Sequence, residues 1–139
     1  MIITLTLNLR SDGETDIIDI TKDVHDLLKT TRLANGIVTL FVPGSTGGLT
    51  TIEYEDGVVK DLKNVFERVA PRNAEYKHNS KWGDGNGFSH VRASLIGPSM
   101  SVPFSGGNLM LGTWQQIVFI DFDNRPRSRE IVAQFIGEK

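Results

Sequence analysis

The sequence predicts a compact single domain of the α+β class, with a mostly antiparallel or mixed β-sheet, two main helices and a short third helix. Strand-like segments outnumber helical ones, and tight turns rather than helical crossovers connect several of them. No repeat, low-complexity tract or linker interrupts the 139 residues, and such a length is typical of a single domain. We therefore expect one domain over residues 1–139.

The first third of the chain predicts a strand followed by a helix. Residues 2–10 alternate apolar and polar side chains, as in a strand with one buried face. Asp19 or Thr21 can cap a helix over residues 21–34, where apolar side chains recur at helical spacing. Asn35-Gly36 is expected to end this helix, because both residues tolerate the left-handed conformation common at helix C-termini.

The middle of the chain predicts a buried strand, a loop, a second strand and a second helix. The β-branched apolar run over residues 36–43 is typical of a strand buried on both faces. A loop over residues 43–48 then leads to a strand over residues 49–54. Asp56 is expected to cap the second helix, which an apolar stripe predicts and which Pro71 ends.

The last part of the chain is expected to complete the sheet. Residues 72–87 are polar and rich in turn-forming residues, which in so small a domain favours a binding or catalytic loop. A short helix over residues 89–96 follows, and the basic segment over residues 125–129 is interpreted as a solvated turn. Three strands joined in part by a hairpin are expected over residues 99–104, 109–123 with an interruption near Gly112, and 129–137.

Composition excludes several classes of protein. Lys and Arg total 15 against 17 Asp and Glu, a net charge of −2, whereas nucleic-acid-binding proteins normally carry a basic excess. The longest apolar run, Ile117–Ile120, is far shorter than the roughly 20 residues of a membrane span. The absence of cysteine excludes disulfides, thiolate metal sites and cysteine nucleophiles. The N-terminal segment has a strand pattern rather than that of a signal peptide, so we expect a cytoplasmic protein without nucleic-acid or membrane partners.

Residues 78–90 hold the most unusual chemistry of the sequence. His78, Asp84 and His90 are evenly spaced, and the glycines near Asp84 allow the backbone to fold back and bring the imidazoles together. Imidazoles with a carboxylate are a common ligand set for divalent ions, so a divalent metal, Zn²⁺ or Mg²⁺, is a predicted cofactor. The alternative is that both histidines are ordinary polar residues that hydrogen-bond a turn.

Two glycine-rich segments match nucleotide-binding motifs only in part. Residues 83–88 place Phe88 where a dinucleotide fingerprint needs its third glycine, and residues 44–50 lack the Gly-Lys-Ser/Thr ending of a phosphate loop. No organic cofactor is therefore predicted. Ser45 and Thr46 nevertheless offer hydroxyl and backbone N–H donors suited to a phosphate group, the alternative being a structural turn.

Five further side chains are candidates for a site. Glu53 and Glu55 lie two apart on a predicted strand and share a face, where they either hold Mg²⁺ or transfer protons, or form a solvated sheet face. Trp114 and Gln115 are suited to wall and orient a flat heterocycle, the alternative being that Trp114 belongs to the core. Arg92, two residues past the second of the paired histidines, is placed to reach a phosphate there.

Four separated blocks of the sequence occur in the same order in one known family. The blocks are Pro43–Glu53, His78–Gly97, Leu111–Val118 and Val132–Glu138. On these blocks the chain resembles the YjbQ family, described as secondary thiamine-phosphate synthase-like proteins. The resemblance extends over nearly the whole chain.

The resemblance implies a compact α+β protein that assembles as a homotrimer and has a polar site near the histidines. It also implies a weak thiamine-phosphate synthase activity, in which an aminopyrimidine diphosphate joins a thiazole phosphate and diphosphate is released. The expected partner is then a small phosphorylated metabolite. The alternative is a protein that binds a metal or such a metabolite without turnover.

One departure limits what the resemblance carries over. Many members have His-Thr-Ser-Ala-Gly-Leu-Thr where this chain has Pro43-Gly-Ser-Thr-Gly-Gly-Leu-Thr, so a metal site here has one fewer nitrogen ligand. The predicted catalytic and metal-binding residues are His78, Asp84 and His90. The predicted substrate-binding residues are Ser45, Thr46, Glu53, Asn86, Arg92, Trp114 and Gln115.

Overall fold

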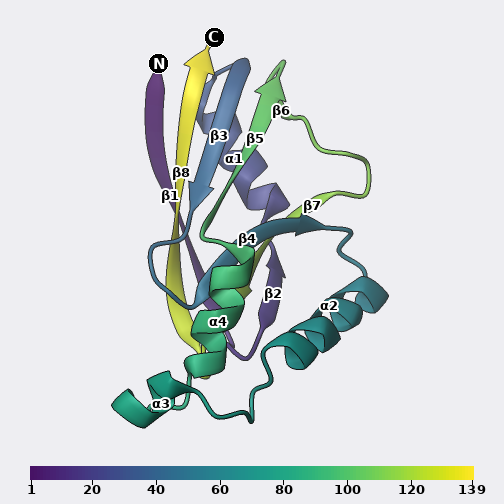
Figure 1. The fold of residues 1–139 in the computed structure, drawn as a ribbon. Coiled ribbons are helices and arrows are strands. Elements are labelled where there is room, and N and C mark those ends of the chain that lie inside the picture. The colour runs from purple at the N-terminus through teal and green to yellow at the C-terminus, as the bar shows by residue number, and fades with distance from the viewer.

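Two antiparallel β-sheets form the framework of the computed structural model, which describes residues 1–139 (Figure 1). The larger sheet has five strands in the order β1-β8-β3-β5-β6. Their bounds are Ile2–Ser11 for β1, Asn35–Phe41 for β3, Ser99–Ser105 for β5, Asn108–Leu109 for β6 and Arg127–Glu138 for β8. Every strand pair is antiparallel, which confirms the predicted α+β class in its antiparallel form.

The smaller sheet has three strands in the order β2-β7-β4. Their bounds are Asp16–Asp19 for β2, Gln116–Asp121 for β7 and Gly47–Ile52 for β4. The central strand β7 is buried along nearly its whole length, which explains its uninterrupted apolar sequence. Strand β2 was not predicted, because four residues are too few to show an alternating pattern.

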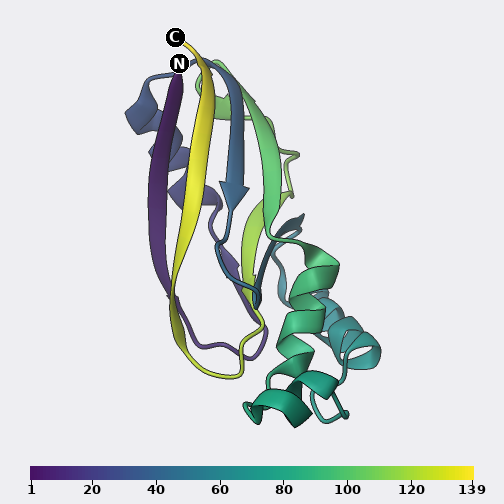
Figure 2. The ribbon, with the colours of Figure 1, turned by 60° about the vertical axis from the view of Figure 1, so that its left-hand side comes forward.

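Four helices complete the fold: α1 is Thr21–Thr31, α2 is Asp56–Val69, α3 is Lys77–Trp82 and α4 is Gly87–Ile96. Helix α1 lies against the larger sheet, whereas α2, α3 and α4 gather at the opposite end of the molecule (Figure 2). Val24 and Leu28 of α1 belong to the same buried cluster as Phe135 of β8. A second buried cluster joins Phe66 of α2 to Ile120 of β7. The first cluster also includes Leu49, Ile117 and Phe119 of the smaller sheet, so the two sheets share it, whereas the second cluster lies between the smaller sheet and helices α2 and α4.

The first helix is shorter than predicted. It ends at Thr31 rather than at residue 34, because Arg32 takes a left-handed φ of 60° and Asn35 already belongs to β3. At the start of the helix, Asp19 accepts hydrogen bonds from the N–H and hydroxyl of Thr21 at 3.0 and 2.7 Å. The N-cap residue is nevertheless Ile20, without a side-chain capping bond, so the prediction of Asp19 or Thr21 at that position is wrong.

The second helix is capped by Glu55 rather than by the predicted Asp56. The Glu55 carboxylate accepts hydrogen bonds from the N–H groups of Gly57 and Val58 at 2.8 and 2.7 Å. These two hydrogen bonds hold the pKa of Glu55 below its ordinary value. Because β4 ends before either glutamate, Glu53 and Glu55 are not paired on a strand face.

Strand β3 has one buried face rather than the two predicted. Val38 and Leu40 are buried, whereas Ile37 and Phe41 are 39% and 43% exposed, because no helix covers the outer face of the larger sheet. The strand expected over residues 109–123 with an interruption near Gly112 is two strands, β6 and β7, and Gly112 lies in the loop between them. The segment over residues 72–87 is also not wholly irregular, since α3 forms within it.

A buried ion pair joins the two sheets. Arg129 of β8 donates from Nε and Nη2 to both carboxylate oxygens of Asp121 in β7, each at 2.8 Å. Ser11, at the end of β1, donates to the same carboxylate, and Thr46, just before β4, accepts from Arg129 at 2.7 Å. The interpretation of residues 125–129 as a solvated turn is therefore wrong for Arg129, which lies between the sheets.

Three consecutive residues between β1 and β2 take left-handed backbone conformations. The φ angle is 71° at Gly13, 55° at Glu14 and 62° at Thr15, and for a residue with a side chain this costs on the order of 1–3 kcal/mol. Distant side chains hold the turn in place. Arg72 donates to the Glu14 carboxylate at 2.8 and 2.6 Å, and Arg92 donates to the Thr15 hydroxyl at 2.8 Å.

The ionisation of Asp121 follows from its partners. Burial raises the pKa of the Asp121 carboxyl, but hydrogen bonds from Arg129, Ser11 and the N–H of Asp123 outweigh burial, so the pKa lies below its ordinary value. The hydrogen bond to Asp121 in turn raises the pKa of Arg129. The pair is therefore ionised throughout the neutral range.

The substitution Asp121→Asn is expected to lower the free energy of unfolding by about 3–5 kcal/mol at neutral pH, because it removes the carboxylate that accepts both hydrogen bonds from the buried Arg129 and leaves only the Asp123 carboxylate, 3.9 Å away, as a counter-charge. A carboxyl whose folded pKa is depressed stabilises the protein above its unfolded pKa, and this stabilisation is lost as the pH falls through the folded pKa. Urea unfolding between about pH 2 and pH 7 measures this dependence. The free energy of unfolding of the wild type should fall as the pH is lowered, and that of the variant should fall less.

The control for this experiment is Asp26→Asn, which removes the carboxylate of an exposed Lys22–Asp26 pair and should unfold like the wild type. Wild-type stability and pH dependence in Asp121→Asn would contradict the role given to the buried pair.

Candidate functional site

The structure brings together the three residues predicted from the even spacing of the histidines. His78 lies on α3, His90 on α4 and Asp84 in the loop between them. The two imidazole rings have their centroids 4.4 Å apart and their planes inclined at 44°. Nδ1 of His78 lies 3.3 Å from Oδ1 of Asp84. One carboxylate and two imidazoles therefore form a single half-exposed cluster.

Close packing between α3 and α4 positions this cluster. Gly83 ends α3 with a left-handed φ of 71°, which turns the chain back toward α4. The Asn79 side-chain oxygen of α3 accepts a hydrogen bond from the N–H of Gly87 at 2.9 Å. A Cβ on Gly87 would lie 2.5 Å from the Cβ of Tyr76, so only glycine permits this approach. The glycines between the two histidines thus allow the chain to fold back, as the sequence predicted.

Asn86 lies against the same carboxylate. With its amide nitrogen turned toward Asp84, it donates to both carboxylate oxygens, at 2.9 and 3.1 Å. Asn124 also donates to the backbone carbonyl of Asp84, at 2.9 Å. Asp84 is therefore held from two sides, which fixes the oxygen that faces His78.

A small hollow of about 210 Å³ opens beside His90. Its wall includes Gly44 and Ser45 from the loop before β4, and Ser94 from α4. The structure thus brings Ser45, one of the predicted phosphate-binding residues, to the same hollow as one of the histidines. The wall also offers the exposed backbone of a glycine, which suits the approach of an anion.

Thr46 faces away from this hollow. Its hydroxyl accepts from Arg129 at 2.7 Å and donates to the buried carboxylate of Asp123 at 3.2 Å. Both interactions are internal and the residue is buried. Thr46 therefore anchors the loop that carries Ser45, and its predicted contact with a ligand is not supported by its position.

Arg92 is also turned into the protein rather than toward a ligand. Its Nε donates to the carbonyl of Ala70 at 3.0 Å, its Nη1 to the hydroxyl of Thr15 at 2.8 Å, and its Nη2 to the carboxylate of Glu67 at 2.7 Å. The guanidinium also lies over the ring of Phe88. All these partners are protein groups, so the structure makes Arg92 a clamp between α2, α4 and the left-handed turn.

Three predicted site residues lie apart from the histidine cluster. Glu53 is exposed just after β4, and Trp114 is 71% exposed in the loop between β6 and β7, so Trp114 is not part of the core. Gln115 holds that loop against β4, because its amide donates to the hydroxyl of Thr51 at 3.0 Å. Figure 1 shows this loop well away from α3 and α4. A single copy of the chain does not bring these residues to the histidines.

The arrangement does not form a complete metal centre. No group of three or more His, Asp or Glu side chains is placed to hold a metal ion. Asp84 contacts His78, and His78 stacks near His90, but the three do not converge on one point. Metal binding at these residues stays a prediction.

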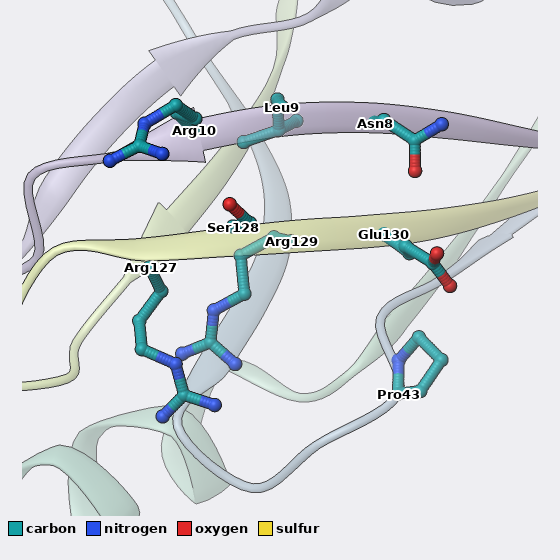
Figure 3. Close-up of a pocket in the computed structure, with 8 residues that line it drawn as sticks. All are labelled: Asn8, Leu9, Arg10, Pro43, Arg127, Ser128, Arg129 and Glu130. Atoms are coloured by element: carbon teal, nitrogen blue, oxygen red, sulfur yellow. The ribbon is translucent and has the colours of Figure 1, made fainter.

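Another hollow, of about 610 Å³, lies beside β8 and was not predicted from the sequence (Figure 3). Arg10, Arg127 and Arg129 line it together with Pro43 and Glu130. Its signal in the sequence is the alternation of arginines over residues 125–129, which places Arg127 and Arg129 on one side of a strand. That alternation becomes informative only once β8 is known to begin at Arg127 rather than Arg129.

Comparison with known proteins identifies relatives that all belong to one family. A family model described as "UPF0047 protein YjbQ-like" matches residues 5–138. A UPF0047 protein of Methanothermobacter thermautotrophicus is 37% identical over 135 residues, which cover 97% of this chain and 92% of that protein. The UPF0047 protein YugU of Bacillus subtilis is 34% identical over 133 residues, covering 95% of this chain and 98% of that one.

Solved structures agree with these relatives. A YbjQ-like protein of unknown function from Sulfolobus solfataricus P2 matches with a TM-score of 0.89 and 26% identity, over 99% of this chain and 100% of that one. A hypothetical protein from Aeropyrum pernix K1 matches with a TM-score of 0.90 and 29% identity, over 98% of this chain and 99% of that one.

None of the helices has the length and apolar character needed to cross a membrane. From its sequence and its fold alike, the chain belongs to the YjbQ-like UPF0047 family.

Proposed function

We propose that the protein acts on a small phosphorylated metabolite at the hollow beside His90. The observation that carries the proposal is the pairing of His90 with His78, whose Nδ1 faces Asp84, next to the loop of Ser45. The hollow of about 210 Å³ is smaller than a site that encloses a whole ligand, which commonly has roughly 300–1,000 Å³. It is therefore suited to one end of a ligand, such as a phosphate group.

The reaction that we propose first is the condensation of an aminopyrimidine diphosphate with a thiazole phosphate. The thiazole nitrogen forms a bond to the methylene carbon of the pyrimidine, while the bond from that carbon to the diphosphate oxygen breaks. Negative charge develops on the leaving diphosphate, where a proton donor lowers the barrier. His90 is the donor that lines the hollow, and Asp84 orients His78 beside it.

Purified protein supplied with both precursors and Mg²⁺ is expected to form thiamine phosphate and diphosphate above a heat-inactivated control. His90→Ala should lower turnover by about 100-fold, as expected for the loss of a general acid or base. His25→Ala, which removes the third histidine on α1, should keep the wild-type rate. Absence of product from the wild-type protein would overturn the proposed reaction, and equal rates in both variants would remove His90 from it.

Binding without turnover is the second candidate function. The observation in its favour is that two imidazoles and a carboxylate lie together in one half-exposed cluster. Neutral imidazoles bind divalent metals through a nitrogen lone pair, which protonation removes. Metal affinity would then fall as the pH is lowered, whereas phosphate affinity for imidazolium groups would rise.

Elemental analysis after chelator treatment and reloading with Zn²⁺ tests the metal. His78→Ala and His90→Ala are each expected to lower the bound metal, because each removes one nitrogen ligand. His25→Ala is the matched control and should bind as much metal as the wild type. If the metal content is unchanged in both site variants, these histidines are not metal ligands.

We also propose a homotrimer, as the family resemblance implies. The outer face of the larger sheet supports an assembly, because three successive cross-strand rows on it carry no charge. The rows are Ile2, Ile136, Ile37 and Pro103; then Thr4, Gln134, Thr39 and Ser101; then Thr6, Val132, Phe41 and Ser99. This uncharged face exposes Ile2, Ile37, Phe41 and Ile136, and exposed apolar side chains gathered on one face commonly mark a protein interface. Homo-oligomers usually close with cyclic symmetry.

Light scattering in solution should give a mass close to three times the 15.4 kDa of one chain. Ile136→Glu, in the middle of the first row, should shift the mass toward that of the monomer, because a charge would be buried in the interface. Val65→Glu, which places the same charge on the exposed side of α2, should keep the wild-type mass. A monomer mass for the wild type across micromolar concentrations would exclude the trimer.

A further inference from the structure

The hollow beside β8 lies where the larger sheet loses a strand. Strand β3 pairs with β8 only as far as Phe41 and Val132, so residues 127–131 of β8 have a strand neighbour, β1, on one side alone. The chain then leaves β3 through Pro43, which lines the hollow opposite β8 (Figure 3). The space of about 610 Å³ is within the range of ligand sites, roughly 300–1,000 Å³.

Hydrogen-bond donors without protein acceptors line this hollow. Arg10 makes no hydrogen bond or ion pair with the protein, although it lies at the end of a well-formed strand. Arg127 uses only Nη1, which donates to Asp123 at 2.7 Å, and its Nε and Nη2 have no protein acceptor. Figure 3 shows the guanidinium groups of Arg127 and Arg129 close together on the side of Pro43.

The charges facing the hollow are mostly positive. Arg10 and Glu130 lie on the outer face of the larger sheet, because Arg10 pairs with Ser128, whereas Arg127 and Arg129 lie on the inner face, so the guanidinium groups approach the hollow from opposite sides of β8. Asp121 and Asp123 offset the charges of Arg127 and Arg129, but both aspartates are buried behind them. Arg10 therefore has no counter-charge in the protein. An anion at this free edge of β8 would meet the unused donors of Arg10 from the outer face and those of Arg127 from the inner face, with Glu130 as the one carboxylate.

We infer that this arginine pocket binds the phosphate or diphosphate group of a phosphorylated ligand. Guanidinium groups bind phosphate oxygens with paired hydrogen bonds, and Leu9 is the only large apolar residue in the wall, which favours a polar ligand. The inference rests on the proposed function for the class of ligand. The inference places the phosphate group of the ligand in the arginine pocket, which is separate from the histidine cluster.

The loop before β4 links the two hollows. Pro43 lines the arginine pocket, whereas Gly44 and Ser45 line the hollow of His90. Gly44 has a φ of 126°, which disfavours any other residue there. The two hollows therefore lie on either side of the same short loop.

Titration calorimetry of the full chain with inorganic diphosphate, in a phosphate-free buffer, tests the inference. Arg10→Gln is expected to weaken binding about tenfold, because it removes charge-assisted hydrogen bonds. Glu130→Gln is expected to tighten binding about threefold, because it removes the one carboxylate that repels the anion. Arg125→Gln, which removes an exposed arginine outside the pocket, should bind within about twofold of the wild type.

The outcomes separate this inference from the proposed function. The double variant His90→Ala with Arg10→Gln should bind diphosphate more weakly than His90→Ala alone, so the response to Arg10→Gln tests the arginine pocket even where turnover is lost. No saturable binding, or wild-type affinity in both Arg10→Gln and Glu130→Gln, would overturn the inference. Equal affinity for citrate, with the same response to the variants, would overturn its assignment to phosphate.

Discussion

The buried pair of Arg129 and Asp121 is the interaction on which the rest of the structure depends. Removing two charges from water costs several kcal/mol for each ion, and only complete hydrogen bonding offsets that cost. Here the Asp121 carboxylate accepts from Arg129, Ser11 and the N–H of Asp123. Because these groups come from β1, β7 and β8, the pair can be satisfied only when both sheets have formed and are correctly placed. It thereby adds a polar coupling between two sheets that also share an apolar cluster through Leu49, Ile117 and Phe119.

The loop from Pro43 to Gly47 connects the buried ion pair to the candidate sites and positions their walls. Thr46 ties the loop to the buried pair, and Gly47 packs so closely that a Cβ there would lie 2.8 Å from the ring of Phe119. The exposed part of the loop, which precedes these anchors, lines the histidine hollow with Ser45 and the arginine pocket with Pro43. Because the loop is anchored on its buried side, it forms a rigid wall for both hollows. A site whose donors must be held in position requires such rigidity.

The sequence predicts the elements better than it predicts the contacts. Alternation over residues 2–10 and the apolar stripe of α2 depend on local periodicity, so β1 and α2 were found. The His78, Asp84 and His90 cluster was also accessible, because the glycines that fold the segment back lie within it. Arg92 and Arg129 were misjudged because their partners are distant: Thr15 is 77 residues from Arg92, and Thr46 is 83 residues from Arg129. In the sequence, an arginine that neutralises a buried carboxylate cannot be distinguished from an arginine that faces solvent.

The left-handed turn over residues 13–15 has a consequence for the order of folding. Its backbone is unfavourable by itself, so the β1–β2 connection gains nothing by forming early from local sequence. The side chains that hold it, Arg72 and Arg92, lie 58 and 77 residues further along the chain. The turn can therefore close only after α2 and α4 have docked, and its closure completes the hydrogen bonds of Arg92. A segment near the N-terminus would in this way be among the last parts of the protein to become ordered, both during refolding and during synthesis on the ribosome.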